Sequence, residues 1–256
     1  MSMLRLIAVG WIFNLKSLRQ SAFFVFTAIL QPVIFATIAV YMFRAGERQG
    51  TLFSVSLGAA LMGMWSSTLF GSGGAITWQR FQGTLELLVA APRPFIVILL
   101  SQTLATATLG IYSLVATMAS GWILFDIKPS VEHPVLFALS IPVTVLGLGL
   151  LGLVFASTFV LYRNSSAFSN LLEYPVWLAS GLLVPISVLP GWARPLSWLL
   201  APTWGIRAFR AAAFGGSALP GLGVSLALGG AYVLVAAVLI VHFERLAREL
   251  ATMALR

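Results

Sequence analysis

Long uncharged apolar runs alternate with short polar segments along almost the whole chain. A run of about 20 apolar residues is long enough to cross the hydrocarbon core of a bilayer as a helix. The pattern therefore predicts an all-α membrane protein with six transmembrane helices. The expected spans are residues 21–43, 51–75, 95–123, 135–162, 171–185 and 221–241.

Residues 1–20 show an amphipathic pattern instead. On a helix of period 3.6, one face would be apolar and another would carry Arg5, Lys16 and Arg19. The apolar face would consist of Leu4, Ile7, Trp11, Leu15 and Leu18. Such a pattern is typical of an interfacial helix that lies along the headgroup layer. A frayed cytosolic tail is the alternative interpretation.

Residues 79–94, between the second and third spans, are the most polar interruption of the apolar pattern. Gly83 and Thr84 form a helix-start signal, and Glu86 suits the first turn of a helix. Apolar residues occupy the middle of the segment, namely Leu85, Leu87, Leu88, Val89 and Ala90. A plain loop does not need these residues, whereas a helix that docks on a partner protein does. We expect such a docking helix, with a solvated connecting loop as the alternative.

Residues 171–220 break the apolar pattern with repeated prolines and tryptophans. They are Pro175, Pro185, Pro190, Pro195, Pro202 and Pro220, with Trp177, Trp192, Trp198 and Trp204 among them. One continuous helix cannot contain so many prolines. We expect the fifth span to end near Pro185 and residues 188–218 to form short helices that dip back toward the membrane, with tryptophans at the headgroup level.

The composition supports a membrane protein and excludes several kinds of site. Hydrophobic residues make up 59% of the chain and charged residues only 9%, against about a quarter charged in soluble domains. The chain has no cysteine, which excludes disulfides and thiolate metal sites. The net charge of +8 comes from bases that flank apolar runs, so it reflects membrane orientation and not nucleic-acid binding.

The loop charges indicate how the chain lies in the membrane. If both termini are cytoplasmic, the cytoplasmic segments carry more lysine and arginine than the external ones, in agreement with the positive-inside rule. This orientation places residues 79–94 in the cytosol and residues 188–218 outside. We expect a multi-pass protein of the cell membrane with both termini cytoplasmic.

No set of residues predicts catalysis or metal binding. His133 and His242 lack a carboxylate or serine arrangement nearby. Glu173 is unusual because a carboxylate inside an apolar stretch is costly and usually faces a polar partner or a cavity. It either faces a substrate path or pairs structurally with Arg163 and Asn164 at the cytoplasmic rim.

Three arginines of the proline-rich region, Arg194, Arg207 and Arg210, also permit two interpretations. They could bind anionic lipid or glycolipid headgroups near the outer leaflet. Alternatively, they cap the short helices and extend their charged ends toward water.

Two separate segments resemble type-2 ABC exporter permeases. The string Gly83-Thr84-Leu85-Glu86, followed by Leu87-Leu88 and Ala91-Pro92, is similar to the hallmark cytoplasmic segment of that family. Relatives commonly have an acidic residue shortly before this glycine, where the present chain has Gln79-Arg80-Phe81-Gln82. The proline and tryptophan strings of residues 181–210 resemble the family's re-entrant extracellular hairpin.

The resemblance implies a transport subunit that is not itself an enzyme. A separate ABC ATPase chain would carry ATP and Mg²⁺, and this chain would bind no cofactor. Two permeases, identical or different, would form the path between them for an amphipathic drug, antibiotic, lipid or lipid-linked glycan. The chain has no glycine-rich phosphate loop, and its cytosolic segments are too short to fold an ATPase domain.

The resemblance also assigns roles to residues. The coupling helix of residues 79–94 would contact the ATPase through Arg80, Phe81, Gly83, Thr84, Leu85, Glu86, Leu87 and Leu88. The candidates for the substrate path are Phe70, Phe155, Phe159 and Glu173.

Two other function classes are compatible with an apolar multi-span chain. An ion-coupled secondary carrier would need ionisable residues at the middle of the membrane, and the spans offer only Glu173. A non-transporting membrane anchor or assembly subunit would use the tryptophan-rich hairpin structurally.

Overall fold

The computed structural model describes residues 3–20, 22–45, 52–84, 87–88, 94–128, 130–161, 165–182, 186 and 189–254. Within these residues the regular elements are helices and no strand occurs. The helices are α1 (Met3–Gln20), α2 (Ala22–Ala45), α3 (Leu52–Phe81), α5 (Phe95–Phe125), α6 (Pro134–Leu161), α7 (Ser165–Ala179), α8 (Arg194–Trp198), α9 (Ala201–Phe214) and α10 (Leu219–Ala254). The prediction of an all-α chain is confirmed.

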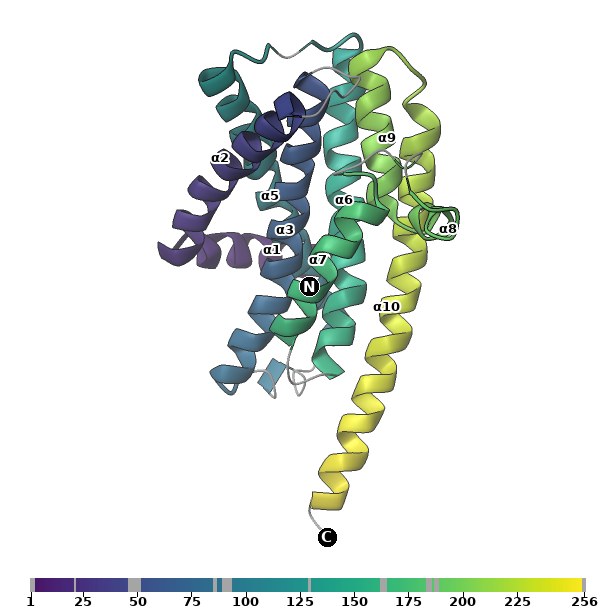
Figure 1. Ribbon diagram of the computed structural model, residues 1–256. Helices are drawn as coiled ribbons and strands as arrows, with labels where there is room; N and C mark the ends of the chain where they lie inside the picture. Colours follow the sequence, from purple (N-terminus) through teal and green to yellow (C-terminus); the bar gives the residue numbers. More distant parts are fainter. Residues whose placement is uncertain are drawn as a thin grey trace.

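Long helices side by side form the body of the molecule (Figure 1). Four of them are long and apolar enough to cross a membrane, and they contain Leu52–Leu69, Phe95–Phe125, Pro134–Thr158 and Leu219–Phe243. Leu30–Arg44 of α2 is a shorter apolar stretch. The chain is therefore a multi-pass membrane protein, and the complete six-span topology stays a prediction.

Helices α3 and α5 approach each other closely because glycine and small residues lie where they meet. A Cβ atom added to Gly63 of α3 would collide with the hydroxyl of Ser113 on α5, and one added to Gly110 of α5 would lie 2.5 Å from Cγ of Met64. Close backbone approach of this kind is how helices associate in a membrane. Helices α3 and α5 thus form one closely packed pair.

Helix α1 lies across the other helices and not along them (Figure 1). The indole Nε1 of Trp11 donates a hydrogen bond of 3.1 Å to Oγ1 of Thr108 on α5. Ile7, Trp11 and Leu15 are half-buried, whereas Arg5 and Lys16 are exposed. The predicted amphipathic helix over residues 1–20 is present, and its place in the headgroup layer stays a prediction.

The chain between α7 and α10 contains the short helices that were predicted for residues 188–218. Helix α8 lies beside the bundle at middle height, and α9 runs from there to the end of the molecule where α10 begins (Figure 1). At that end the backbone N–H groups of Glu132 and His133 donate to the carbonyls of Ala213 and Ala212, at 3.1 and 3.0 Å. The α5–α6 loop therefore caps the C-terminus of α9.

A tyrosine of α10 forms hydrogen bonds with the backbone groups at the break between α8 and α9. The hydroxyl of Tyr232 donates to the carbonyl of Leu199 at 2.5 Å and accepts from the N–H of Ala201 at 2.9 Å. Ser225, also on α10, donates to the carbonyl of Ala201 at 3.4 Å. Tyr232 lies roughly 20 Å along α10 from Leu219, at 1.5 Å per residue. The carbonyl of Leu199 and the amide of Ala201 thus find their partners within the protein, which is what a helix break inside a membrane would require.

Replacing Tyr232 by phenylalanine tests this role. The Tyr232→Phe variant leaves the Leu199 carbonyl and the Ala201 amide without their partner, so we expect the free energy of unfolding to fall by about 1–3 kcal/mol. The midpoint of thermal unfolding in detergent should drop by several degrees. Tyr112→Phe is the matched control, since Tyr112 is exposed on α5. Equal midpoints for the two variants would contradict the assignment.

Candidate functional site

The C-terminus of α3 is closed by a compact backbone motif centred on Gly83. The N–H of Thr84 donates to the carbonyl of Gln79 at 2.9 Å, and the N–H of Gly83 donates to the carbonyl of Arg80 at 3.0 Å. This pair of bonds is a Schellman motif, which needs a left-handed residue just past the helix. Gly83 supplies it with φ of +68°, a conformation that glycine adopts without steric cost.

The following helix begins directly after this motif. The N–H of Leu88 donates to the carbonyl of Thr84 at 3.1 Å, which is a helical bond, and Leu87 and Leu88 are helical. Thr84 therefore ends one motif and starts the next, in agreement with the predicted helix-start signal. Because α3 continues to Phe81, the first residues of the predicted 79–94 segment belong to α3. Leu85 and Glu86 lie outside the described residues.

The predicted coupling residues that are described include two highly exposed apolar side chains. Phe81 is 83% exposed and Leu87 is 71% exposed, whereas Leu88 packs against the core. Arg80 is partly buried, and this burial lowers the pKa of its guanidinium from the ordinary value. An arginine stays protonated under such conditions, so the turn presents apolar side chains beside a positive charge.

Glu173 is buried, with 7% of its surface exposed, and its partner comes from α3. The hydroxyl of Ser66 donates to Oε1 of Glu173 at 2.5 Å, which joins α7 to the middle of α3. Arg163 and Asn164, the partners considered from the sequence, lie outside the described residues. Sequence reasoning missed Ser66, although the run of Ser66, Ser67 and Thr68 inside an apolar span marks a polar position.

Phe155 contacts α3 at the residue next to the one that Glu173 contacts. Its ring meets the buried indole of Trp65 edge to face, with centroids 5.9 Å apart. Phe155 and Glu173 thus contact neighbouring residues of α3 from two different helices, α6 and α7. The side chains of Phe70 and Phe159 lie outside the described part of the chain. The grouping of the four path candidates therefore stays a prediction.

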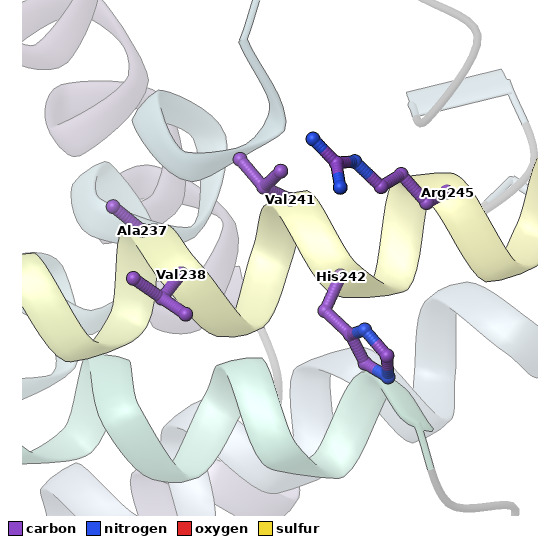
Figure 2. A pocket seen from close by; sticks show the side chains of 5 residues that line it. All are labelled: Ala237, Val238, Val241, His242 and Arg245. Atoms are coloured by element: carbon purple, nitrogen blue, oxygen red, sulfur yellow. The ribbon is translucent and has the colours of Figure 1, made fainter.

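Figure 2 shows a recess on the C-terminal half of α10. Its lining consists of Ala237, Val238, Val241, His242 and Arg245. These residues all come from one helix, so no polar groups from other elements converge on a ligand there. Over the described residues, no group of three or more histidine, aspartate or glutamate side chains is arranged to hold a metal ion.

The sequence of the chain matches the profile of one protein family. The profile of the ABC-2 type transporter family matches residues 5–214 of the chain. The matched region includes α1, the Gly83–Thr84 turn, Glu173 and α9. No curated protein matches the chain significantly.

Replacing Gly83 by alanine tests the left-handed turn. A Cβ atom at Gly83 meets nothing within 4 Å, so the cost of Gly83→Ala is the backbone strain alone, about 1 kcal/mol or more. We expect a lower midpoint of thermal unfolding in detergent. Gly223→Ala is the control, because that position is also open and alanine is the better helix former. If both variants were equally stable, the turn would not require glycine.

The buried Ser66–Glu173 bond gives a second prediction. Ser66→Ala leaves the Glu173 carboxyl without its donor, and we expect the protein to lose about 1–3 kcal/mol of stability. Ser67→Ala should change stability by less than about 0.5 kcal/mol, because the Ser67 hydroxyl bonds only to the Met64 carbonyl of its own helix. The measurement is the midpoint of thermal unfolding of each purified variant. If Ser66→Ala unfolds at the same temperature as the wild-type protein, the bond does not stabilise the fold.

Proposed function

Because the chain belongs to the ABC-2 type transporter family, we propose that it is the permease subunit of an ATP-driven exporter. The match over residues 5–214 is the observation that carries this proposal. A separate ATPase subunit would bind ATP and Mg²⁺. A second permease, either a copy of this chain or a related protein, would complete the path across the membrane.

The turn between α3 and α5 is the proposed contact with the ATPase. Exposed apolar side chains on an element outside the membrane usually mark a protein interface, and Phe81 and Leu87 are such side chains. The contact comprises Arg80, Phe81, Gly83, Thr84, Leu85, Glu86, Leu87 and Leu88. The Schellman motif supports this role because it satisfies the backbone of the turn with bonds inside the turn itself.

The packing of α3 on α5 supports a path for motion from the ATPase into the membrane. The turn lies between these two helices, and their close contacts at Gly63 and Gly110 lie far from it along the chain. Tightly packed elements shift between discrete arrangements and do not deform continuously. ATP binding would favour one arrangement of the spans and hydrolysis the other, as a population shift. Helix α1 would follow α5 through the Trp11–Thr108 bond.

The substrate is proposed to be amphipathic. The candidate path residues Phe70, Phe155 and Phe159 are aromatic, and Glu173 is the only charged side chain among the described buried residues. Such a lining suits a drug, antibiotic, lipid or lipid-linked glycan. An ion-coupled carrier would need more ionisable groups at this depth, and no observation favours a membrane anchor.

A substitution at the exposed turn tests the proposal. The Leu87→Arg variant places a second positive charge near Arg80 in the proposed contact, so we expect binding of the ATPase subunit to weaken by about tenfold or more. ATP hydrolysis by the purified complex should fall in parallel. The measurement is co-purification of the ATPase from native membranes, followed by an ATP hydrolysis assay.

Leu219→Arg is the matched control for this experiment. Leu219 is similarly exposed but begins α10 at the opposite end of the bundle, so this variant should keep its ATPase. The proposal fails if wild-type protein purifies without an ATPase and without ATP hydrolysis. The assignment of the contact alone fails if Leu87→Arg retains the ATPase as well as Leu219→Arg does.

A further inference from the structure

Arg207 is an exposed cation of α9 that no carboxylate among the described residues neutralises. Its guanidinium carbon lies 4.8 Å from the centroid of the Trp204 ring, in a cation–π contact. Trp204 is held in place because its Nε1 donates to the carbonyl of Trp198 at 2.9 Å. The arginine therefore has a fixed orientation on a fixed aromatic surface.

The position of Arg207 along α9 places it below the end of the bundle. Ala213 is level with the α5–α6 loop, since its carbonyl accepts from Glu132. Arg207 precedes Ala213 by six residues, or roughly 9 Å along the helix axis. Because α9 runs from middle height to that end of the molecule (Figure 1), the backbone of Arg207 lies nearer the middle of the bundle than the polar loop does.

The guanidinium points deeper still. Side chains on an α-helix lean toward its N-terminus, and the N-terminus of α9 is the end at middle height. Trp204 lies one turn toward that end, so an arginine stacked on it does not reach outward to water as a snorkelling side chain would. A cation held in this way near hydrocarbon is stabilised by an anion beside it.

An exposed apolar surface adjoins this cation. Besides Arg194 and Pro195, the exposed residues of α8 and its flanks include four large apolar ones, namely Trp192, Leu196, Trp198 and Leu199. We call Arg207, Trp204 and these four residues the α8–α9 shelf. It places the Arg207 guanidinium beside aromatic and aliphatic side chains, and Arg194 adds a second exposed positive charge on α8. This combination suits the charged headgroup and the acyl chains of an anionic lipid.

We propose that the α8–α9 shelf binds an anionic phospholipid of the leaflet nearer the α9–α10 turn. The guanidinium receives the phosphate, because its planar array of N–H donors can bind two phosphate oxygens at once while its face stays stacked on Trp204. The acyl chains lie along Trp198, Leu199 and Leu196. Tyr232 holds this surface in place relative to α10, because it forms hydrogen bonds with the backbone of Leu199 and Ala201.

Lipid selectivity of the purified protein tests the site. The full chain, in mild detergent, is titrated with dioleoyl-phosphatidylglycerol or with dioleoyl-phosphatidylcholine, and bound lipid is counted by native mass spectrometry. We expect wild-type protein to prefer phosphatidylglycerol and Arg207→Ala to lower that preference by about fivefold or more. Arg207→Lys keeps the charge but loses the planar guanidinium that stacks on Trp204 and binds two phosphate oxygens. This variant should therefore show an intermediate preference for phosphatidylglycerol.

Two further variants separate the shelf from general electrostatic attraction. Arg44→Ala removes an exposed arginine from the last turn of α2. Tyr41 of the same helix meets Phe125 at the end of α5, so Arg44 lies at the same end of the molecule as Arg207. Arg44→Ala should leave the lipid preference unchanged. Trp204→Leu should lower the preference although it retains the charge.

Three results would overturn the proposal. The first is equal binding of the two lipids by wild-type protein. The second is a loss of preference in Arg44→Ala as large as in Arg207→Ala. The third is efficient disulfide formation between two copies of an Arg207→Cys variant in native membranes, because it would show that a second copy of the chain covers the shelf.

Discussion

The structure depends on the requirement that every backbone polar group inside a membrane finds a partner within the protein. Continuous helices meet it by themselves, but the junction of α8 and α9 does not. There Tyr232 serves both Leu199 and Ala201 from α10. The other end of α9 receives its partners from the N–H groups of Glu132 and His133. Helix α9 is thus fixed at both ends by other parts of the chain.

The two interruptions of the helical pattern differ in where their partners come from. At Gly83 the chain turns with bonds to Gln79 and Arg80, a few residues away. Because its hydrogen bonds are local, the shape of this turn does not depend on contacts with distant parts of the chain. This independence suits an element that meets a moving partner. The α8–α9 junction instead depends on residues more than 30 positions away. It therefore moves only with α10, which suits a surface that must keep a fixed depth.

The sequence predicted what depends on local pattern. The apolar periodicity located α1, α3, α5, α6 and α10, the Gly83–Thr84 pair indicated the turn, and the prolines placed short helices between residues 188 and 218. The continuation of α3 to Phe81 was not predicted, because the polar Gln79 and Arg80 interrupt the apolar run without ending the helix. Glu173 was singled out from the sequence, but its partner Ser66 was missed. Ser66 and Glu173 are 107 positions apart, and nothing in the residues near either one identifies the other. The candidates Leu85, Glu86, Phe70 and Phe159 stay predictions.

The central claim is that the turn between α3 and α5 contacts a separate ATPase, and crosslinking tests it most directly. The chain has no cysteine of its own, so a Leu87→Cys variant carries a single site for a photoactivated crosslinker. The account predicts that illumination of native membranes joins this position to a chain with an ATPase sequence, identified by mass spectrometry, while a Leu219→Cys variant gives no such product. Crosslinks from position 87 to lipid alone, or equal ATPase crosslinks from both positions, would contradict it.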